Sequence, residues 1–301
     1  MIKKFLDSPH RFLVGFLLVF TMLCYSCCAL QRTEPIIDLH TDLDAVEGSL
    51  RATVAFVRPQ TSGTGTTYCS GFFVSETRII SAGHCFQTAL RIPVPDGTFI
   101  ELPGINDPTG EEVFFARYGE IDLFTNQVIG EPEQANIIYF DREYDVAILE
   151  LASNVPHSRY FFPFAVEIPR VGSAAYGVGH PSRLPWSFSS GIISRVITES
   201  GDRTAFLQSS VPTVPGNSGG PLLNSRGELI GMAEGFIDRF PHLAIFTSVD
   251  RIRSAMRSSW RRQATMALTE ALGASHDPNQ PSQNIDAGTS EVPENRSSES
   301  P

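Results

Sequence analysis

Short apolar runs, each ended by turn-forming residues, dominate the middle of this 301-residue chain. They are rich in Val, Ile and Phe and are bounded by Gly, Pro, Ser and Asn, which is typical of β-strands. Helical periodicity is rare among them, so the pattern predicts an all-β fold, either a sandwich or a pair of barrels. The predicted strands are 52–57, 71–74, 78–81, 136–140, 146–151, 174–178, 191–198, 205–209, 221–224, 229–233 and 243–247.

Other segments lack this pattern. Residues 31–49 are polar and acidic and are interpreted as a linker, while 93–132 is acidic and interrupted by Gly and Pro, as in a long excursion between strands with local hairpins. Residues 273–301 are rich in Ser, Pro, Asn and Glu, a composition that predicts a disordered acidic tail. One globular domain is therefore expected over 50–272.

A helix is predicted at the end of this domain. Ile252, Met256 and Trp260 recur at a helical interval within 248–272, with arginines between them. The apolar side of this amphipathic helix would pack on the strands. Its basic side either contacts anionic lipid or is simply solvated.

The N-terminal segment 1–30 resembles a targeting sequence. Three basic residues precede 12–30, an uncharged run that is long enough to cross a bilayer and also fits a secretory signal. Cleavage after Ala29, retention as an anchor and lipidation of Cys27 remain open. In each case the rest of the chain is exported, to the periplasm or the exterior, and a retained segment would tether it to the membrane.

Cysteine usage agrees with export. Three of the five cysteines lie within the N-terminal apolar run, so only Cys69 and Cys85 belong to the rest of the chain. Two thiols in an oxidising compartment are expected to form a disulfide. The alternative is a pair of buried, unpaired thiols.

A glycine-flanked serine is the first candidate for chemistry. It is Ser218, in the run Pro-Gly-Asn-Ser-Gly-Gly-Pro-Leu at 215–222. A serine hydroxyl needs a neighbouring base to act as a nucleophile, and its attack creates an oxyanion that needs hydrogen-bond donors. The flexible backbone at Gly216 would let its N–H point inward beside that of Ser218. On turn chemistry alone, the run would more often be an ordinary turn.

A histidine and an aspartate are candidates for the partners of that serine. His84 ends an apolar strand in Ser-Ala-Gly-His-Cys, where an imidazole can act first as a base and then as an acid. Asp145 opens Asp-Val-Ala-Ile-Leu, directly against an apolar run, and a carboxylate there can fix the histidine tautomer. Asp122 is the second candidate for this carboxylate.

Taken in this order, the three motifs resemble those of trypsin-like serine proteases of the chymotrypsin fold. Gly-Val-Gly-His-Pro at 177–181, Ser-Gly-Ile-Ile-Ser at 190–194 and Asn-Ser-Arg-Gly-Glu-Leu-Ile-Gly-Met at 224–232 are similar to bacterial HtrA/Deg-type and glutamyl-endopeptidase-like members. The resemblance covers about residues 51–256.

The resemblance implies two six-stranded antiparallel β-barrels with the active site between them. It implies a serine endopeptidase that cleaves polypeptides through an acyl-enzyme and uses no metal or other cofactor. Ser218 would be the nucleophile, His84 the general base and Asp145 the orienting acid. The N–H groups of Gly216 and Ser218 would form the oxyanion hole.

Three features mix or depart from the family's pattern. Cys69 and Cys85 would form the histidine-loop disulfide of the animal enzymes, which HtrA-type enzymes often lack. Asn217 stands where zymogen-activated relatives carry an aspartate that pairs with a freed N-terminal amine, so we expect no trypsinogen-style activation. Too little ordered chain follows Leu272 for the PDZ domain that HtrA-type proteins usually carry, so we expect none.

The resemblance also indicates a substrate site. Pro212 and Thr213 lie where the family lines its primary pocket, and no aspartate stands there to favour Arg or Lys. Ala233, Glu234 and Gly235 are expected to form the edge strand that pairs with the substrate backbone. Glu234 either favours a basic side chain or faces solvent, and small or medium apolar side chains are the expected preference.

Other functions compete less well. An exported pseudoenzyme or binding module would keep the fold without the chemistry, but all three candidate residues are present. A net charge of −10 argues against nucleic acid as the main partner. A zinc site is disfavoured because the histidines lack ligand spacing. These histidines are His40, His84, His157, His180 and His242.

Overall fold

The computed structural model describes residues 42–59, 65–88, 90–93, 99–102, 106–125, 127–199, 204–237 and 240–274. The predicted signal or anchor at 1–30 and nearly all of the predicted tail at 273–301 lie outside these residues. Each helix that the structure describes is too short or too polar to cross a bilayer. The chain divides into two compact units, one that runs to Ser259 and one that begins at Trp260.

Six antiparallel strands of the first unit close into a barrel in the order β1-β2-β3-β8-β7-β6. Its core is built from large apolar side chains that are almost fully buried, because alternate residues of each strand point inward. The strands are β1 (Thr53–Pro59), β2 (Gly65–Phe73), β3 (Arg78–Ala82), β6 (Glu112–Ala116), β7 (Glu133–Asp141) and β8 (Val146–Leu151).

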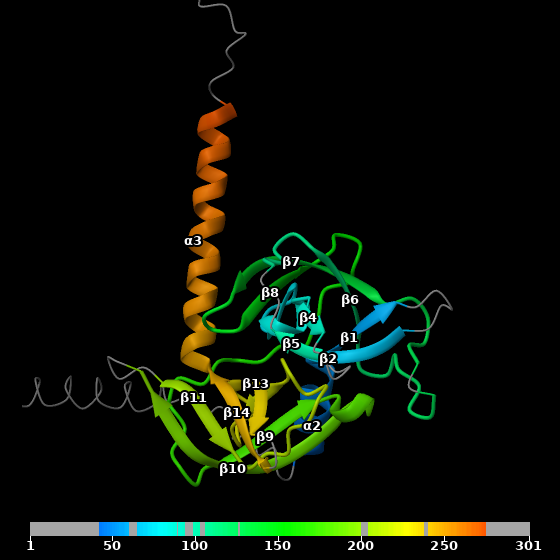
Figure 1. Cartoon of the computed structure of the whole chain (residues 1–301), viewed down its shortest axis with the longest axis vertical. Coiled ribbons are helices and arrows are strands. Elements are labelled where there is room, and N and C mark those ends of the chain that lie inside the picture. The colour runs from blue at the N-terminus through cyan, green and yellow to red at the C-terminus, as the bar shows by residue number, and fades with distance from the viewer. Residues whose placement is uncertain are drawn as a thin grey trace, which may run out of the picture. The chain divides into compact units, whose positions relative to one another are not determined.

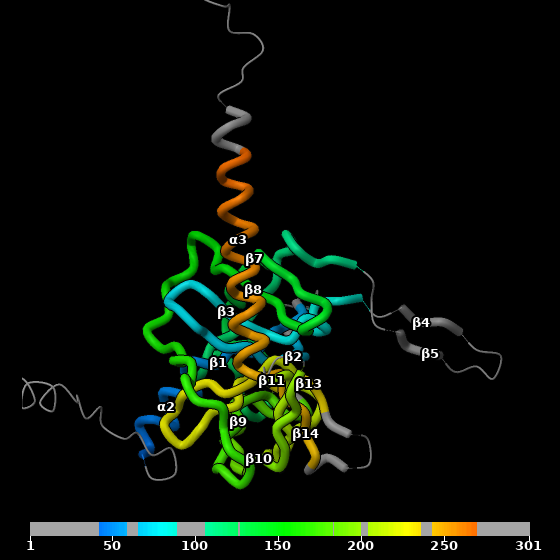
Figure 2. The backbone as a smooth tube through the Cα atoms, turned by 90° about the vertical axis from the view of Figure 1, so that its left-hand side faces the viewer, coloured from blue at the N-terminus to red at the C-terminus, as the bar shows by residue number. Residues whose placement is uncertain are grey.

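Six further strands close a second barrel in the order β10-β11-β14-β13-β12-β9, and the two groups of strands remain separate in two perpendicular views (Figures 1 and 2). The prediction of two six-stranded antiparallel barrels is confirmed. The strands are β9 (Ala174–Gly179), β10 (Ser187–Thr198), β11 (Thr204–Ser209), β12 (Pro221–Leu223), β13 (Leu229–Ile237) and β14 (Phe240–Ser248).

One barrel strand lies where the sequence indicated a long excursion. The segment 93–132 contains β6, which pairs with both β1 and β7 and closes the first barrel. Its sequence Glu-Val-Phe-Phe-Ala is short and begins with a charge, so it did not stand out in its acidic surroundings. A two-stranded hairpin, β4 (Leu90–Pro93) and β5 (Phe99–Leu102), precedes it.

Two helices flank the barrels in sequence. Helix α2 (Leu43–Arg51) occupies the last part of the predicted linker, and Asp42 caps it by accepting from the N–H groups of Asp44 and Ala45. Helix α3 (Val249–Ala274) agrees with the predicted C-terminal helix. Its first turns bury Ile252 in the first unit, and its part in the second unit leaves large apolar side chains about half exposed. These are Trp260, Met266 and Leu268.

Candidate active site

His84 and Asp145 form a tightly bound pair. His84 lies in the 3-10 turn η1 (Gly83–Phe86) after β3, and its Nδ1 is 2.6 Å from Oδ2 of Asp145. The backbone N–H of His84 donates to the other carboxylate oxygen at 2.7 Å, and that of Gly83 donates to the Asp145 carbonyl at 2.9 Å. Asp145 has a left-handed φ of 52°, which a short polar side chain tolerates. These three bonds fix the imidazole against the start of β8.

The surroundings of His84 favour its charged form. Burial lowers the pKa of His84, but the hydrogen bond and charge of Asp145, with the charge of Glu234, raise it above the usual value. The side chain of His84 is nevertheless 41% exposed. The ring is therefore anchored at Nδ1 while part of it remains open to a cavity.

The loop from Pro212 to Pro221, which we call the serine loop, carries Ser218. Its conformation requires glycine at two points. Gly216 has φ of +101°, and an added Cβ would lie 2.2 Å from the carbonyl oxygen of His180. Gly219 has φ of +82°, and its Cβ would lie 2.2 Å from the carbonyl oxygen of Ser70. A side chain at either place would therefore displace the loop.

The backbone N–H groups of Gly216 and Ser218 in the serine loop are unpartnered among the described residues. Those of Asn217, Gly219 and Gly220 donate to backbone carbonyls at 2.8 to 3.0 Å. Among the residues that the structure describes, those of Gly216 and Ser218 have no acceptor. Gly216 and Ser218 are partly exposed, so their free N–H groups can donate to an anionic oxygen of a ligand.

The Gly216 N–H has a defined direction. The carbonyl of Pro215 accepts a hydrogen bond of 2.8 Å from the N–H of Ser182. A trans peptide is planar, so the N–H of the same peptide unit, that of Gly216, points away from Ser182. Gly216 and Ser218 line one cavity together with His84.

This cavity has a volume of about 740 Å³ and lies between the two barrels. It joins His84 from the first barrel to Ser218 from the second, as the sequence predicted for the active site. The hydroxyl of Ser218 has no hydrogen-bonding partner among the described residues. The lining residues are Arg58, Tyr68, Cys69, His84, Cys85, Phe86, Gln87, Thr88, Glu111, Val113, Pro215, Gly216 and Ser218.

A disulfide joins Cys69 on β2 to Cys85 beside His84. It ties the histidine turn to the neighbouring strand. Potential metal-ligating atoms of Cys69, His84 and Cys85 lie within 4.8 Å of one another. The two sulfur atoms are bonded to each other and carry no thiolate charge, so this cluster does not have the character of a metal site.

Asp122 lies in a turn of its own. Its carboxylate accepts from the backbone N–H groups of Phe124 at 2.9 Å and Thr125 at 2.7 Å. These bonds lower its pKa. Asp122 is thus a turn residue, and Asp145 is the carboxylate that binds His84.

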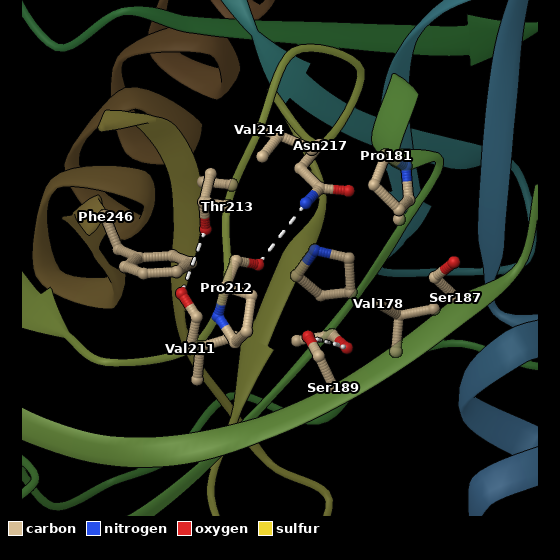
Figure 3. Close-up of a pocket in the computed structure, with 14 residues that line it drawn as sticks. Val178, Pro181, Ser187, Ser189, Val211, Pro212, Thr213, Val214, Asn217 and Phe246 are labelled. Carbon is tan, nitrogen blue, oxygen red and sulfur yellow. Dashed lines mark hydrogen bonds between the residues drawn. The ribbon is translucent and has the colours of Figure 1, made fainter. Parts of the chain in front are cut away.

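A second, smaller cavity of about 90 Å³ also lies against the serine loop (Figure 3). Pro212 and Thr213, the predicted pocket residues, line it, and no carboxylate does. Asn217 faces this cavity whereas its neighbours Gly216 and Ser218 face the larger one. The other lining residues are Gly177, Val178, Gly179, Pro181, Ser187, Ser189, Val211, Val214, Pro221, Ala233 and Phe246.

The predicted edge strand differs at Ala233. Its carbonyl accepts from Gly219 and its N–H donates to Gly220, both at 2.8 Å, so its backbone is already paired with the serine loop. Ala233 also lines the smaller cavity, and pairing of the substrate backbone with this strand stays a prediction. The register in which β13 pairs with β14 shifts between Ala233 and Gly235, so Glu234 lies at an irregularity of β13.

Glu234 is half-buried and hydrogen-bonded rather than fully exposed. It accepts a hydrogen bond of 2.8 Å from Oγ1 of Thr247. Burial, with the nearby charge of Asp145, raises its pKa, while Thr247, Arg251 and His84 oppose that rise. The carboxyl therefore lies within electrostatic range of the histidine pair.

Sequence reasoning missed the role of His180 and Ser70. In the sequence, His180 is one of several scattered histidines. In the structure, His180 is fully buried and hydrogen-bonded to Ser70 of the other barrel. The Gly-His-Pro run within a family-like motif was the only available indication. Burial and a contact across 110 residues cannot be read from that run.

The comparison with protein families agrees with this geometry. The trypsin-like peptidase domain model matches residues 69–232, more than half of the chain. The chain belongs to this family. The trypsin-like peptidase domain thus includes the disulfide, the histidine pair and the serine loop.

Several curated proteins similar to this trypsin-like domain are bacterial serine endoproteases. Serine endoprotease DegS of Haemophilus influenzae is 32% identical over 108 residues, which are 33% of this chain and 30% of that protein. A probable periplasmic serine endoprotease, DegP-like, of Halomonas elongata is 37% identical over 111 residues, which are 34% of this chain and 22% of that protein. The match therefore spans less than a third of either relative.

Solved structures show the same fold. The serine endoprotease from Yersinia pestis superposes with a TM-score of 0.50 at 22% identity, over 72% of this chain and 65% of that one. This likeness supports the two-barrel architecture of the trypsin-like domain.

Proposed function

We propose that this chain is an exported serine endopeptidase that hydrolyses polypeptides through an acyl-enzyme. The observation that carries the proposal is one cavity between the barrels. It holds the carboxylate-bound imidazole of His84, the unpartnered hydroxyl of Ser218 and the free N–H groups of Gly216 and Ser218.

In the first step Nε2 of His84 takes the hydroxyl proton of Ser218 while Oγ forms a bond to the substrate carbonyl carbon. The carbonyl oxygen becomes an oxyanion between the N–H groups of Gly216 and Ser218. Asp145 holds Nδ1–H and stabilises the imidazolium. Catalytic hydrogen bonds are often long in a ligand-free enzyme, so the unpartnered hydroxyl agrees with this role.

The second half of the cycle returns the proton. The imidazolium of His84 donates it to the departing amine as the C–N bond breaks, which leaves an acyl group on Ser218. Water then loses a proton to His84 and attacks the acyl carbon. Collapse of this intermediate frees the acid and restores the Ser218 hydroxyl.

Specificity for a small or medium apolar side chain is part of the proposal. The cavity beside Pro212 and Thr213 is small, mostly apolar and without a carboxylate, which favours an uncharged side chain. Export is also proposed, from the sequence of 1–30 and from the periplasmic DegP-like relatives.

The test is active-site labelling combined with turnover. A fluorophosphonate probe should label the wild-type chain at Ser218, and Ser218→Ala should lose both labelling and peptide hydrolysis while melting at the same temperature. Ser225→Ala, in the exposed turn after β12, is the control and should retain both. Equal hydrolysis by wild type and Ser218→Ala would end the proposal, and a folded wild type that neither labels nor cleaves would favour a pseudoenzyme.

A further inference from the structure

A buried histidine lies on the interior side of the serine loop. His180 follows β9 and is 0% exposed. Its Nδ1 lies 2.8 Å from Oγ of Ser70, and its backbone N–H donates to the same oxygen at 3.2 Å. Ser70, on β2 of the first barrel, is also fully buried, and its hydroxyl donates to the carbonyl of Gly216 at 2.8 Å. These three residues form a chain of hydrogen bonds that ends at the serine loop.

A proton count fixes the direction of this chain. The hydroxyl of Ser70 has one hydrogen, and the carbonyl of Gly216 can only accept. The hydrogen therefore goes to Gly216, and Oγ of Ser70 must accept from the Nδ1–H of His180. Burial lowers the pKa of His180 to about 3, so the ring is neutral and carries its single hydrogen on Nδ1.

The other ring nitrogen agrees with this tautomer. Nε2 of His180 is buried without a hydrogen-bonding partner among the described residues, and the ring meets that of Trp186 edge to face at 4.5 Å. A hydrogen on Nε2 would be a buried donor without an acceptor, which is costly. It would also require Ser70 to donate to His180 and so deprive Gly216 of its donor.

The hydrogen bonds from His180 through Ser70 to Gly216 hold the Gly216 N–H, one of the two groups that would bind the oxyanion. The carbonyl of Pro215 is held by Ser182 and that of Gly216 by Ser70, so both sides of the Gly216 N–H are fixed. Glycine rotates freely when such bonds are lost, and rotation would remove the N–H from the cavity.

We propose that His180 is a positioning residue which, through Ser70, holds the carbonyl of Gly216 and so keeps the Gly216 N–H directed into the active-site cavity. This inference rests on the proposed function, because it assigns the purpose of the bonds to oxyanion binding. His180 itself does not touch the substrate.

Kinetics of two variants test the chain. Ser70→Ala and His180→Phe each remove one link, and kcat should fall by roughly tenfold to a hundredfold with KM changed by less than about twofold, because an oxyanion donor acts mainly in the transition state. Ser158→Ala removes a hydroxyl that is equally buried, at 3% exposure, and bonded to the Tyr160 carbonyl at 2.7 Å. This control should keep kcat.

A conservative variant separates positioning from packing. His180→Asn places an amide N–H close to the position of Nδ1, so it should recover much of the kcat that His180→Phe loses. Unchanged kcat in Ser70→Ala, or an equal loss in Ser158→Ala, would overturn the proposal. So would a His180→Asn variant that is no better than His180→Phe.

Nitrogen NMR of the wild-type chain tests the network without any activity. The imidazole of His180 should show a hydrogen on Nδ1 and none on Nε2, with no titration between pH 5 and 8. A hydrogen on Nε2, or titration of His180 in this range, would overturn the inference even if the variants do not fold. A wild type with the expected NMR signature but no peptidase activity would instead refute the proposed function.

Discussion

The two faces of the serine loop differ in almost every physical property. The cleft face opens into a cavity of about 740 Å³, where the ring of His84 is part exposed and bound to a carboxylate. The interior face meets a cavity of about 90 Å³ and the fully buried ring of His180, which is bound to a hydroxyl. The two histidines therefore lie in opposite environments, one beside a charge and partly exposed, the other beside a neutral hydroxyl and buried.

The partner atoms explain this difference. A carboxylate beside Nδ1 stabilises the imidazolium, so the pKa of His84 rises and the ring can accept a proton during a reaction. Burial beside a neutral hydroxyl destabilises the imidazolium, so the pKa of His180 falls to about 3 and the ring cannot change charge under ordinary conditions. Chemistry needs the first property, and a fixed scaffold needs the second.

The largest expected effect comes from removing the carboxylate charge that distinguishes the surroundings of His84 from those of His180. Asp145→Asn removes the charge that supports His84, so kcat should fall by about 10³- to 10⁴-fold, as in other triads that lose this carboxylate. The acid limb of kcat/KM should also move to lower pH, because burial, which lowers the pKa of His84, is then less opposed. Rate profiles from pH 5 to 9 measure both effects.

The control for this variant is Asp122→Asn. Asp122 has the same side chain in a surface turn, so its loss should leave kcat and the acid limb unchanged. A similar fall in kcat for both variants would mean that Asp145 has no special role beside His84.

Both cysteines of the disulfide line the larger cavity, so its reduction loosens the cleft face. Closing a loop of 16 residues by the bond between Cys69 and Cys85 is expected to stabilise the fold by about 3 kcal/mol. Denaturant unfolding with and without reductant should show this loss, and the double variant Cys69→Ala/Cys85→Ala should be insensitive to reductant. An identical unfolding midpoint for the wild type in both conditions would contradict the expectation.

The sequence predicts the cleft face far better than the interior face. Ser218, His84 and Asp145 each lie in a local motif whose neighbours carry the information, such as the glycines around Ser218. The strands follow from the apolar runs, since a buried strand shows its character within five or six residues, whereas their arrangement in two barrels is implied by the resemblance to trypsin-like serine proteases.

The interior face depends on contacts between distant residues. Ser70 and His180 are 110 positions apart, and nothing in either neighbourhood indicates that they meet. The pairing of Ala233 with the serine loop depends on an irregular register in β13, which no composition reveals. Helix α2 was predictable, because Asp42 is a typical N-cap and Val46 and Leu50 recur at a helical interval.

The small cavity allows a third test, on the interior face. Ala233→Leu adds a larger apolar side chain at a residue that is 4% exposed, so it should fill part of the space. The preference for Val over Ala before the cleaved bond should fall by roughly tenfold, the range expected for one or two methylene groups. A ratio of kcat/KM values measures this preference and is independent of how much enzyme is folded. An unchanged ratio would show that the cavity does not bind that side chain.

The smallest expected effect concerns Glu234, which influences the cleft face from β13. Its charge is one of the causes that raise the pKa of His84, so Glu234→Gln should move the acid limb of kcat/KM to lower pH, by less than Asp145→Asn does. The amide oxygen can still accept from Thr247, and kcat on the high-pH plateau of the profile should change by less than about twofold. Glu228→Gln is the control, because Glu228 is bound to Asn224 and Arg226 in the turn before β13. If Glu234→Gln moves the limb to higher pH, or Glu228→Gln moves it as far, then the charge of Glu234 does not act on His84.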